Sequence, residues 1–155
     1  MSGTAIVIGY GNELRGDDAI GQQVAKAIKF WCLSSVKSVA VHQLTPELAE
    51  PLANSQLAIF VDACINSQSH EVQVKPLLPS ESNTINPHTS DPQTLLFLAQ
   101  FLYGNCPLAW LVTVPGVNFE LSDRISPTAQ KGITTALSKI MQILDKHNNL
   151  GMNSE

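Results

Sequence analysis

Acidic side chains follow two apolar segments that have the composition of buried strands. Asp17 and Asp18 come shortly after the first segment, and Asp62 lies at the end of a later one. Because ligands in open α/β sheets bind outside the carboxyl ends of the strands, these carboxylates are expected at one crevice. His88, in a polar loop further along the chain, adds an imidazole. Two carboxylates and one imidazole suit a borderline divalent metal ion, so a site with mixed oxygen and nitrogen ligands is expected.

Each of these residues also has a structural explanation. One of Asp17 and Asp18 is expected to cap the helix that follows, since capping needs a single side chain. Asp62 could cap a turn, but a carboxylate at the end of a buried strand is costly unless it has a partner, which favours a functional role. Taken alone, His88 is more typical of a solvated loop histidine than of a ligand.

Other chemistries are disfavoured. Gly9 and Gly11 suggest a dinucleotide-binding turn, but Leu14 stands where that fingerprint has its third glycine, and the two adjacent aspartates would repel a pyrophosphate. Cys64 and His88 could act as a thiol nucleophile and its base, yet the sequence offers no cationic neighbour or helix N-terminus to activate the thiol. The serines lack the flanking glycines of a nucleophile elbow, so a serine hydrolase is disfavoured as well.

Strand-like runs alternate with helical patterns along the chain. Strands are expected at 4–8, 39–44, 57–63 and 109–114, with an extra strand at 72–75. Helices are expected after the two aspartates and after Thr45, Asp91 and Ser126, each of which precedes a proline suited to the first helical position. Right-handed crossovers place such helices on both faces of a parallel sheet. We therefore predict a three-layer α/β/α sandwich with a mostly parallel, twisted sheet of about five strands.

Three segments carry further expectations. The last helix has an apolar stripe from Ile133 to Leu144 that should face the core. The helix around Phe97 is apolar nearly all round, and burial is the expected reason, with an interface as the alternative. The polar segment from Ser67 to Pro92 is expected to be an ordered functional loop or a lid. His42, near the end of the second strand, is expected to support the site from a second layer of residues.

Length and composition describe one globular domain. The 155 residues are 44% hydrophobic and 14% charged, and we expect a single domain over residues 1–150 with a frayed tail at 151–155. A net charge of −4 without basic runs disfavours nucleic acid and anionic membranes as partners. Three scattered cysteines indicate reduced, mostly buried thiols rather than disulfides or a zinc site. A monomer in the cytoplasm, with no membrane span, is expected.

The segment Gly9-Tyr10-Gly11-Asn12-Glu13-Leu14-Arg15-Gly16-Asp17-Asp18 resembles the opening motif G-x-G-N-x-L-x-x-D-[DE] of the hydrogenase maturation proteases. The apolar strand ending in Asp62-Ala63, the pair Pro87-His88 before a helix, and Ile125-Ser126-Pro127 before the last helix agree with the family in order. The likeness spans most of the chain, and the match to the cyanobacterial branch looks best.

The resemblance implies a function and a set of site residues. It implies a hydrolase, an endopeptidase that removes a C-terminal extension from the large-subunit precursor of a nickel-iron hydrogenase after nickel insertion. The family's metal-site and catalytic residues correspond to Asp18, Asp62 and His88, which implies an aspartic-type endopeptidase activity. Nickel would be supplied by the substrate, so the resting enzyme would be metal-free. Such a ligand set leaves coordination positions open for nickel already held by the precursor.

Two departures from the family and two alternatives accompany this interpretation. Ala19 replaces a common glycine after the acidic pair, which a helix tolerates, and His42 to Thr45 replace a common D-G-G-T, so His42 could tune substrate choice. One alternative is a general metal-dependent peptidase or amidohydrolase that keeps its own metal. The other is a non-catalytic chaperone that docks at the nickel site.

Overall fold

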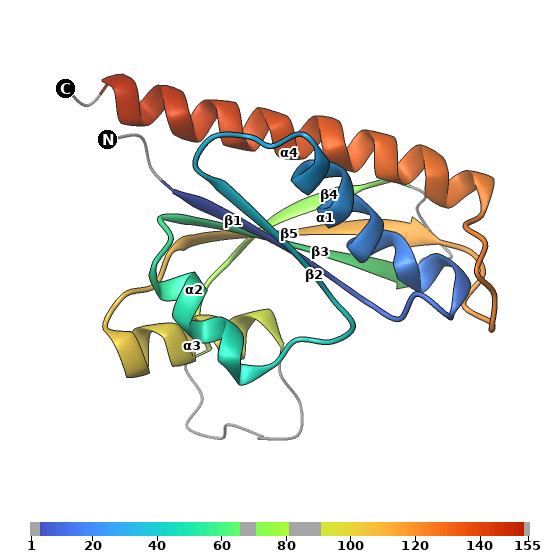
Figure 1. The fold of residues 1–155 in the computed structure, drawn as a ribbon, viewed down its shortest axis with the longest axis horizontal. Coiled ribbons are helices and arrows are strands. Elements are labelled where there is room, and N and C mark those ends of the chain that lie inside the picture. Colours follow the sequence, from blue (N-terminus) through green and yellow to red (C-terminus); the bar gives the residue numbers. More distant parts are fainter. Residues whose placement is uncertain (1–3, 66–70, 81–90, 154–155) are drawn as a thin grey trace.

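A twisted five-stranded sheet forms the middle layer of the part of the chain that the computed structural model describes, residues 4–65, 71–80 and 91–153 (Figure 1). The strand order is β2-β1-β3-β5-β4. The first four of these run parallel, and β4 pairs antiparallel with β5 at the edge. The strands are β1 (Ala5–Tyr10), β2 (Val36–Val41), β3 (Leu57–Ile65), β4 (Gln73–Leu77) and β5 (Leu108–Gly116).

Helices cover both faces of this sheet. They are η1 (Gly16–Ala19), α1 (Ile20–Phe30), η2 (Pro46–Leu48), α2 (Ala49–Ala53), α3 (Pro92–Tyr103) and α4 (Pro127–Asn153), where η denotes a 3-10 helix. Figure 1 shows α1 and α4 on one face and α2 and α3 on the other. The predicted three-layer α/β/α sandwich with a mostly parallel sheet is therefore confirmed.

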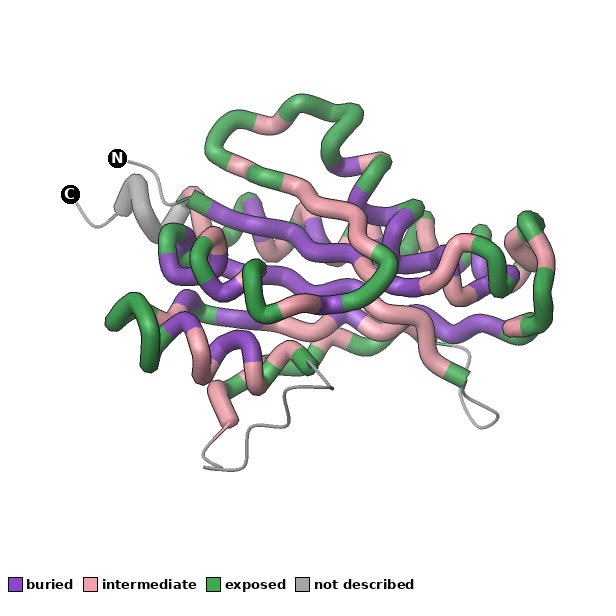
Figure 2. The backbone as a smooth tube through the Cα atoms, turned by 60° about the horizontal axis from the view of Figure 1, so that its bottom comes forward, coloured by how far each residue is buried: buried purple, intermediate pink, exposed green. Residues whose placement is uncertain are grey.

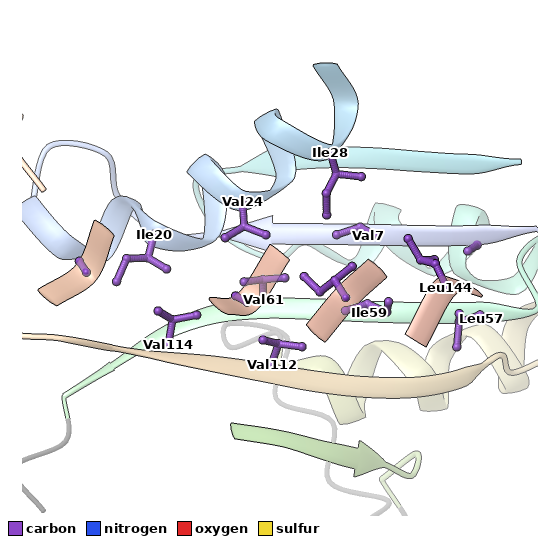
Figure 3. Packing of buried hydrophobic residues seen from close by; sticks show 14 residues of the cluster. Val7, Ile20, Val24, Ile28, Leu57, Ile59, Val61, Val112, Val114 and Leu144 are labelled. Carbon is purple, nitrogen blue, oxygen red and sulfur yellow. The ribbon is translucent and has the colours of Figure 1, made fainter. Parts of the chain in front are cut away.

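Two apolar clusters hold the layers together. In the first, the apolar side of α1 packs with that of α4 on the strands, and Figure 3 shows Val24 and Ile28 of α1 pointing towards the strand residues Val7 and Val61. The second cluster, on the other face, contains Phe60 of β3 and Leu95 of α3. All six of these side chains are at most 1% exposed. Alternating strand residues supply the two clusters, because successive side chains of a strand point to opposite faces.

The predicted helix starts are confirmed at all three Xaa-Pro sites. The Asp91 carboxylate accepts a hydrogen bond of 2.7 Å from the Thr94 backbone N–H and caps α3. The Ser126 hydroxyl accepts one of 3.1 Å from the Ala129 N–H in the first turn of α4. Thr45 is extended before Pro46 and makes no side-chain cap bond. The proline and the extended residue before it thus define these starts even where the side-chain bond is missing.

The second strand lies three residues earlier than predicted. It covers Val36–Val41 instead of 39–44, because β1 offers it partners only between Ala5 and Tyr10, and this register ends with Tyr10 opposite Val41. The chain then turns away from the sheet, and Leu44 enters the second cluster. Val39 and Val41 of the strand and Leu44 of the following loop thus pack against the same second cluster.

Helix α3 is buried on one side only, so the expectation of deep burial is wrong for its last turn. Leu95 and Leu96 are fully buried, whereas Phe101 is 72% exposed and Leu102 is 57% exposed. Figure 2 shows the exposed residues at the end of this helix. One side of the helix packs in the second cluster and beside α2, whereas the rings of Phe97 and Phe101 stack on one another.

Helix α4 runs along the whole length of the sheet. Its predicted stripe is confirmed, with Ala136, Ile140 and Leu144 buried against the first cluster. The helix continues through Asn153, so 151–153 of the expected tail are helical. Within the described ranges, no helix combines the length and the apolar character that a membrane span needs.

Candidate active site

The site residues gather where β1 and β3 end at the same edge of the sheet. Gly9 of β1 is in register with Val61 of β3, which places Tyr10 and Asp62 side by side at the next position of each strand. The Tyr10 hydroxyl donates a hydrogen bond to the Asp62 carboxylate. Helix η1 follows β1 after a short loop, and it brings Asp18 close enough for its charge to act on Asp62.

The surroundings of Asp62 disfavour the ionised form of its carboxyl group. Burial raises the pKa of Asp62 from its ordinary 3.8 to about 6, and the neighbouring charge of Asp18 acts in the same direction. The hydrogen bonds from Tyr10 and from the Ala63 backbone oppose this rise without cancelling it. Burial, and next the charge of Asp62, raise the pKa of Tyr10 far above its usual range, so its hydroxyl stays a donor. Two half-buried carboxylates thus repel one another, an arrangement that a bound cation would relieve.

The loop before η1 fixes the position of Asp18. The Asp18 Oδ2 accepts a hydrogen bond of 2.8 Å from the Asn12 backbone N–H, which belongs to this loop. Gly11 has φ = 147°, and a Cβ at this position would lie 2.0 Å from the Asp18 carbonyl oxygen, so only glycine fits. The Gln22 side-chain amide, itself buried in α1, donates to the Gly11 carbonyl at 2.7 Å. The opening motif therefore builds a tight turn that holds one carboxylate at the strand end.

Asp17 has a different role from its neighbour. It is fully buried, and its carboxylate accepts hydrogen bonds from the backbone N–H groups of Val117, Asn118 and Ser126 at 2.7, 3.1 and 2.8 Å, and from the Ser126 hydroxyl at 2.7 Å. Burial alone would raise the pKa of Asp17, but these bonds outweigh it and hold the pKa below its ordinary value. Asp17 thus ties the loop after β5 to η1.

The prediction that Asp17 or Asp18 caps the first helix is wrong. Neither η1 nor α1 has a side-chain cap bond at its start. Both carboxylates instead accept hydrogen bonds from backbone that lies outside the helix, because η1 places them under the adjoining loops.

The predicted third ligand cannot be placed. His88 lies outside the described residues, as does much of the segment from Ser67 to Pro92, of which 73–77 form β4. Within the described part, no group of three or more His, Cys, Asp or Glu side chains is arranged to hold a metal ion. The structure therefore brings Asp18 and Asp62 together, and the membership of His88 stays a prediction.

The other candidate groups are less suited to chemistry. Burial, and next the charge of Asp62, raise the pKa of the Cys64 thiol, which disfavours its thiolate as a nucleophile. Cys106 is half-buried, but Cys32 is exposed, contrary to the expectation of mostly buried thiols. His42 is exposed directly after β2, and its supporting role stays a prediction.

Sequence reasoning missed two features of the site. Tyr10 stands at a variable position of the glycine motif, and its place at the end of a buried strand is the signal that it faces the crevice. The loop after β5 was not connected with Asp17, because 109 residues separate Asp17 from Ser126 and no local pattern relates them.

Several solved structures have a fold similar to that of this chain. No family model matches the chain, and a sequence search of curated proteins finds no match. Among solved structures, the hydrogenase maturating endopeptidase HybD from E. coli matches with a TM-score of 0.73 and 24% identity over 92% of this chain and 93% of that one. The [NiFe] hydrogenase maturation protease HycI from Thermococcus kodakarensis KOD1 matches with a TM-score of 0.73 and 20% identity over 92% of each chain.

A solution structure of an endopeptidase from Escherichia coli also matches, with a TM-score of 0.69 and 25% identity over 92% of this chain and 93% of that one. These matches cover nearly all of both chains, so they concern the whole fold and not a shared fragment. The chain thus has the fold of the hydrogenase maturation proteases, which confirms the resemblance that its opening motif indicated.

Proposed function

We propose that this protein is an endopeptidase that removes the C-terminal extension from the large-subunit precursor of a nickel-iron hydrogenase. It recognises nickel that the precursor already holds, through Asp18, Asp62 and His88. The free state of all three cysteines is compatible with action in the reducing cytoplasm, and we propose that it acts there as a monomer.

The observation that carries this proposal is the pairing of Asp18 and Asp62 at the strand ends. Burial raises the pKa of Asp62 to about 6, with Asp18 adding repulsion, and a structural ion pair would have the opposite effect. Buried carboxylates are costly unless they are partnered or coordinate a metal. Asp62 and Asp18 accept hydrogen bonds, but the interactions that act on Asp62 include no positive charge. A dication that arrives with the substrate supplies this charge, so binding relieves the repulsion between the two carboxylates.

Two carboxylates with an imidazole match the borderline character of nickel. Because such a set leaves coordination positions free, it can engage an ion that thiolates of the precursor hold at the same time. This contact would bring the scissile peptide beside the carboxylates. Hydrolysis adds water across the peptide bond: the water oxygen bonds to the carbonyl carbon, the C–N bond breaks, and protons reach the leaving amine. Asp18 or Asp62 is placed to accept the proton that the water loses.

The test incubates nickel-loaded precursor with the protein and follows loss of the C-terminal peptide by mass spectrometry. Wild-type protein is expected to shorten the precursor, and Asp62→Asn, Asp18→Asn and His88→Ala are expected to do so at a rate at least about a hundredfold lower. Asp145→Asn, an exposed carboxylate on α4, is the matched control and should retain full activity. Full activity of a folded Asp62→Asn variant would overturn the proposal.

The purified protein and the precursor also test the two alternative functions, a metal-dependent peptidase with its own ion and a docking chaperone. A tightly bound, stoichiometric metal in the purified protein would favour a general metal-dependent peptidase with its own ion. Precursor that binds to wild-type protein but is never shortened would favour a docking chaperone.

A further inference from the structure

Two loops beside the carboxylates are joined to one another by backbone hydrogen bonds. The loop after β1 and the loop after β5 lie at the same end of the sheet, as Figure 1 shows in blue and orange. The Ser122 N–H donates to the Leu14 carbonyl at 2.9 Å, and the Gly16 N–H donates to the Ser122 carbonyl at 2.9 Å. This pattern makes Arg15 and Ser122 the partners of a parallel bridge.

The bridge brings the backbones of two exposed leucines close together. Because the Leu14 carbonyl accepts the hydrogen bond from the Ser122 N–H, the backbone of Leu14 lies beside the peptide unit that joins Leu121 to Ser122. Leu14 precedes Arg15, and Leu121 precedes Ser122. Leu14 is 67% exposed and Leu121 is 85% exposed. We call this pair the leucine shelf.

The shelf is held rigidly. The Arg15 Nε donates to the Phe119 carbonyl at 3.2 Å, and the Asp17 carboxylate fixes the same loop through Val117, Asn118 and Ser126. The Leu14 N–H donates to the Asn12 side-chain oxygen at 2.9 Å. Exposed apolar side chains on such ordered loops lose little conformational freedom when a partner covers them, which favours binding.

The shelf is continuous with the candidate active site. The Asn12 residue that accepts from the Leu14 N–H also donates its own N–H to Asp18. A peptide that lies against Asp18 and Asp62 can therefore reach the shelf with a few further residues of extended chain. Arg15 and Arg124 balance Glu120 and Asp123 on the two loops, and Asp18 and Asp62 make the region acidic. The surface thus suits a segment with apolar side chains and no excess of negative charge.

We propose that the leucine shelf binds the C-terminal segment of the substrate in an extended conformation. This inference rests on the proposed function, since it takes the occupant to be the precursor's own C-terminal segment. Because the contact is made by groups remote from the reacting atoms, it holds substrate and transition state equally.

The test compares shelf variants with a matched control. The double variant Leu14→Ser, Leu121→Ser is expected to raise KM for nickel-loaded precursor about tenfold with kcat unchanged, since it removes apolar contact area made before and during the reaction. Leu108→Ser is the control, because Leu108 is 70% exposed at the opposite end of β5 and should leave KM unchanged. Leu14→Met with Leu121→Met keeps the apolar surface and should retain the wild-type KM.

Binding is measured separately from cleavage, by anisotropy of a labelled precursor. Weaker binding by the serine variant, with normal thermal unfolding, supports the shelf even if wild-type protein fails to cleave, an outcome that would overturn the proposed function alone. Cleavage by wild type with unchanged KM and binding in the serine variant overturns the shelf alone. A concentration-dependent dimer that the serine variant abolishes would also overturn it, because the shelf would then be an interface between two copies.

Discussion

Replacing Asp62 by asparagine should stabilise the folded protein at neutral pH while it abolishes the proposed activity. The pKa of Asp62 is raised to about 6 in the folded state, from an ordinary value of 3.8. The folded state therefore binds the proton of Asp62 more tightly than the unfolded state does. As the pH rises from the ordinary pKa through about 6, this proton is lost and the free energy of unfolding decreases. Asparagine is neutral at every pH and keeps an oxygen that can accept from Tyr10.

The size of the effect follows from the two pKa values. Their difference corresponds to about 3 kcal/mol, which is an upper bound because Asp62 is only half-buried. For a chain of this length, such a difference corresponds to a rise in Tm of roughly 6–12 °C at neutral pH. Well below pH 3.8 the wild-type carboxyl is protonated in both the folded and the unfolded state, so the advantage of the variant should vanish there.

The assay is urea unfolding of both proteins between about pH 3 and pH 8, with a chelator present so that no metal pairs with the carboxylates. Asp17→Asn is the matched control with the opposite sign. Hydrogen bonds hold the pKa of Asp17 low, so its stabilisation is present above the ordinary pKa and is lost only as the pH falls below it. The control should therefore be less stable than wild type, by roughly 3 kcal/mol, across the whole neutral range.

A constant free-energy difference between wild type and Asp62→Asn from acid to neutral pH would refute this reasoning. A variant that is less stable than wild type at neutral pH would refute it too, since Asp62 would then contribute to the fold rather than oppose it.

Three further predictions concern single contacts. Tyr10→Phe removes the hydroxyl that donates to Asp62 and should raise the pKa of Asp62 above about 6, which titration of the carboxyl carbon by NMR would show; an unchanged pKa would contradict the contact. Asp91→Ala removes the cap of α3 and should cost about 1 kcal/mol in urea unfolding, whereas Asp91→Asn should cost much less. Gly21→Ala should destabilise by roughly 2 kcal/mol or more, because its Cβ would lie 2.4 Å from the Tyr10 carbonyl oxygen and 2.6 Å from that of Val61; a neutral result would contradict the close packing of α1 on the strands.

The sequence by itself determined the architecture and the general place of the site. Apolar periodicity and the Xaa-Pro dipeptides depend on neighbouring residues, so the alternation of strands and helices, the starts of α3 and α4, and the core side of α4 could be predicted. The rule that polar residues after parallel strands share one edge then placed Asp18 and Asp62 together.

Only the tertiary structure showed the role of Asp17. Asp17 and Asp18 are adjacent and chemically identical, and their roles diverge because one meets the loop after β5 and the other faces β3. The resemblance to the family selected Asp18 for the site, but the partners of Asp17 lie far away in sequence, so no local pattern indicates them. For the same reason the hydrogen bond of Tyr10 to Asp62 and the bridge between Arg15 and Ser122 emerged only from the fold, which brings distant segments into contact.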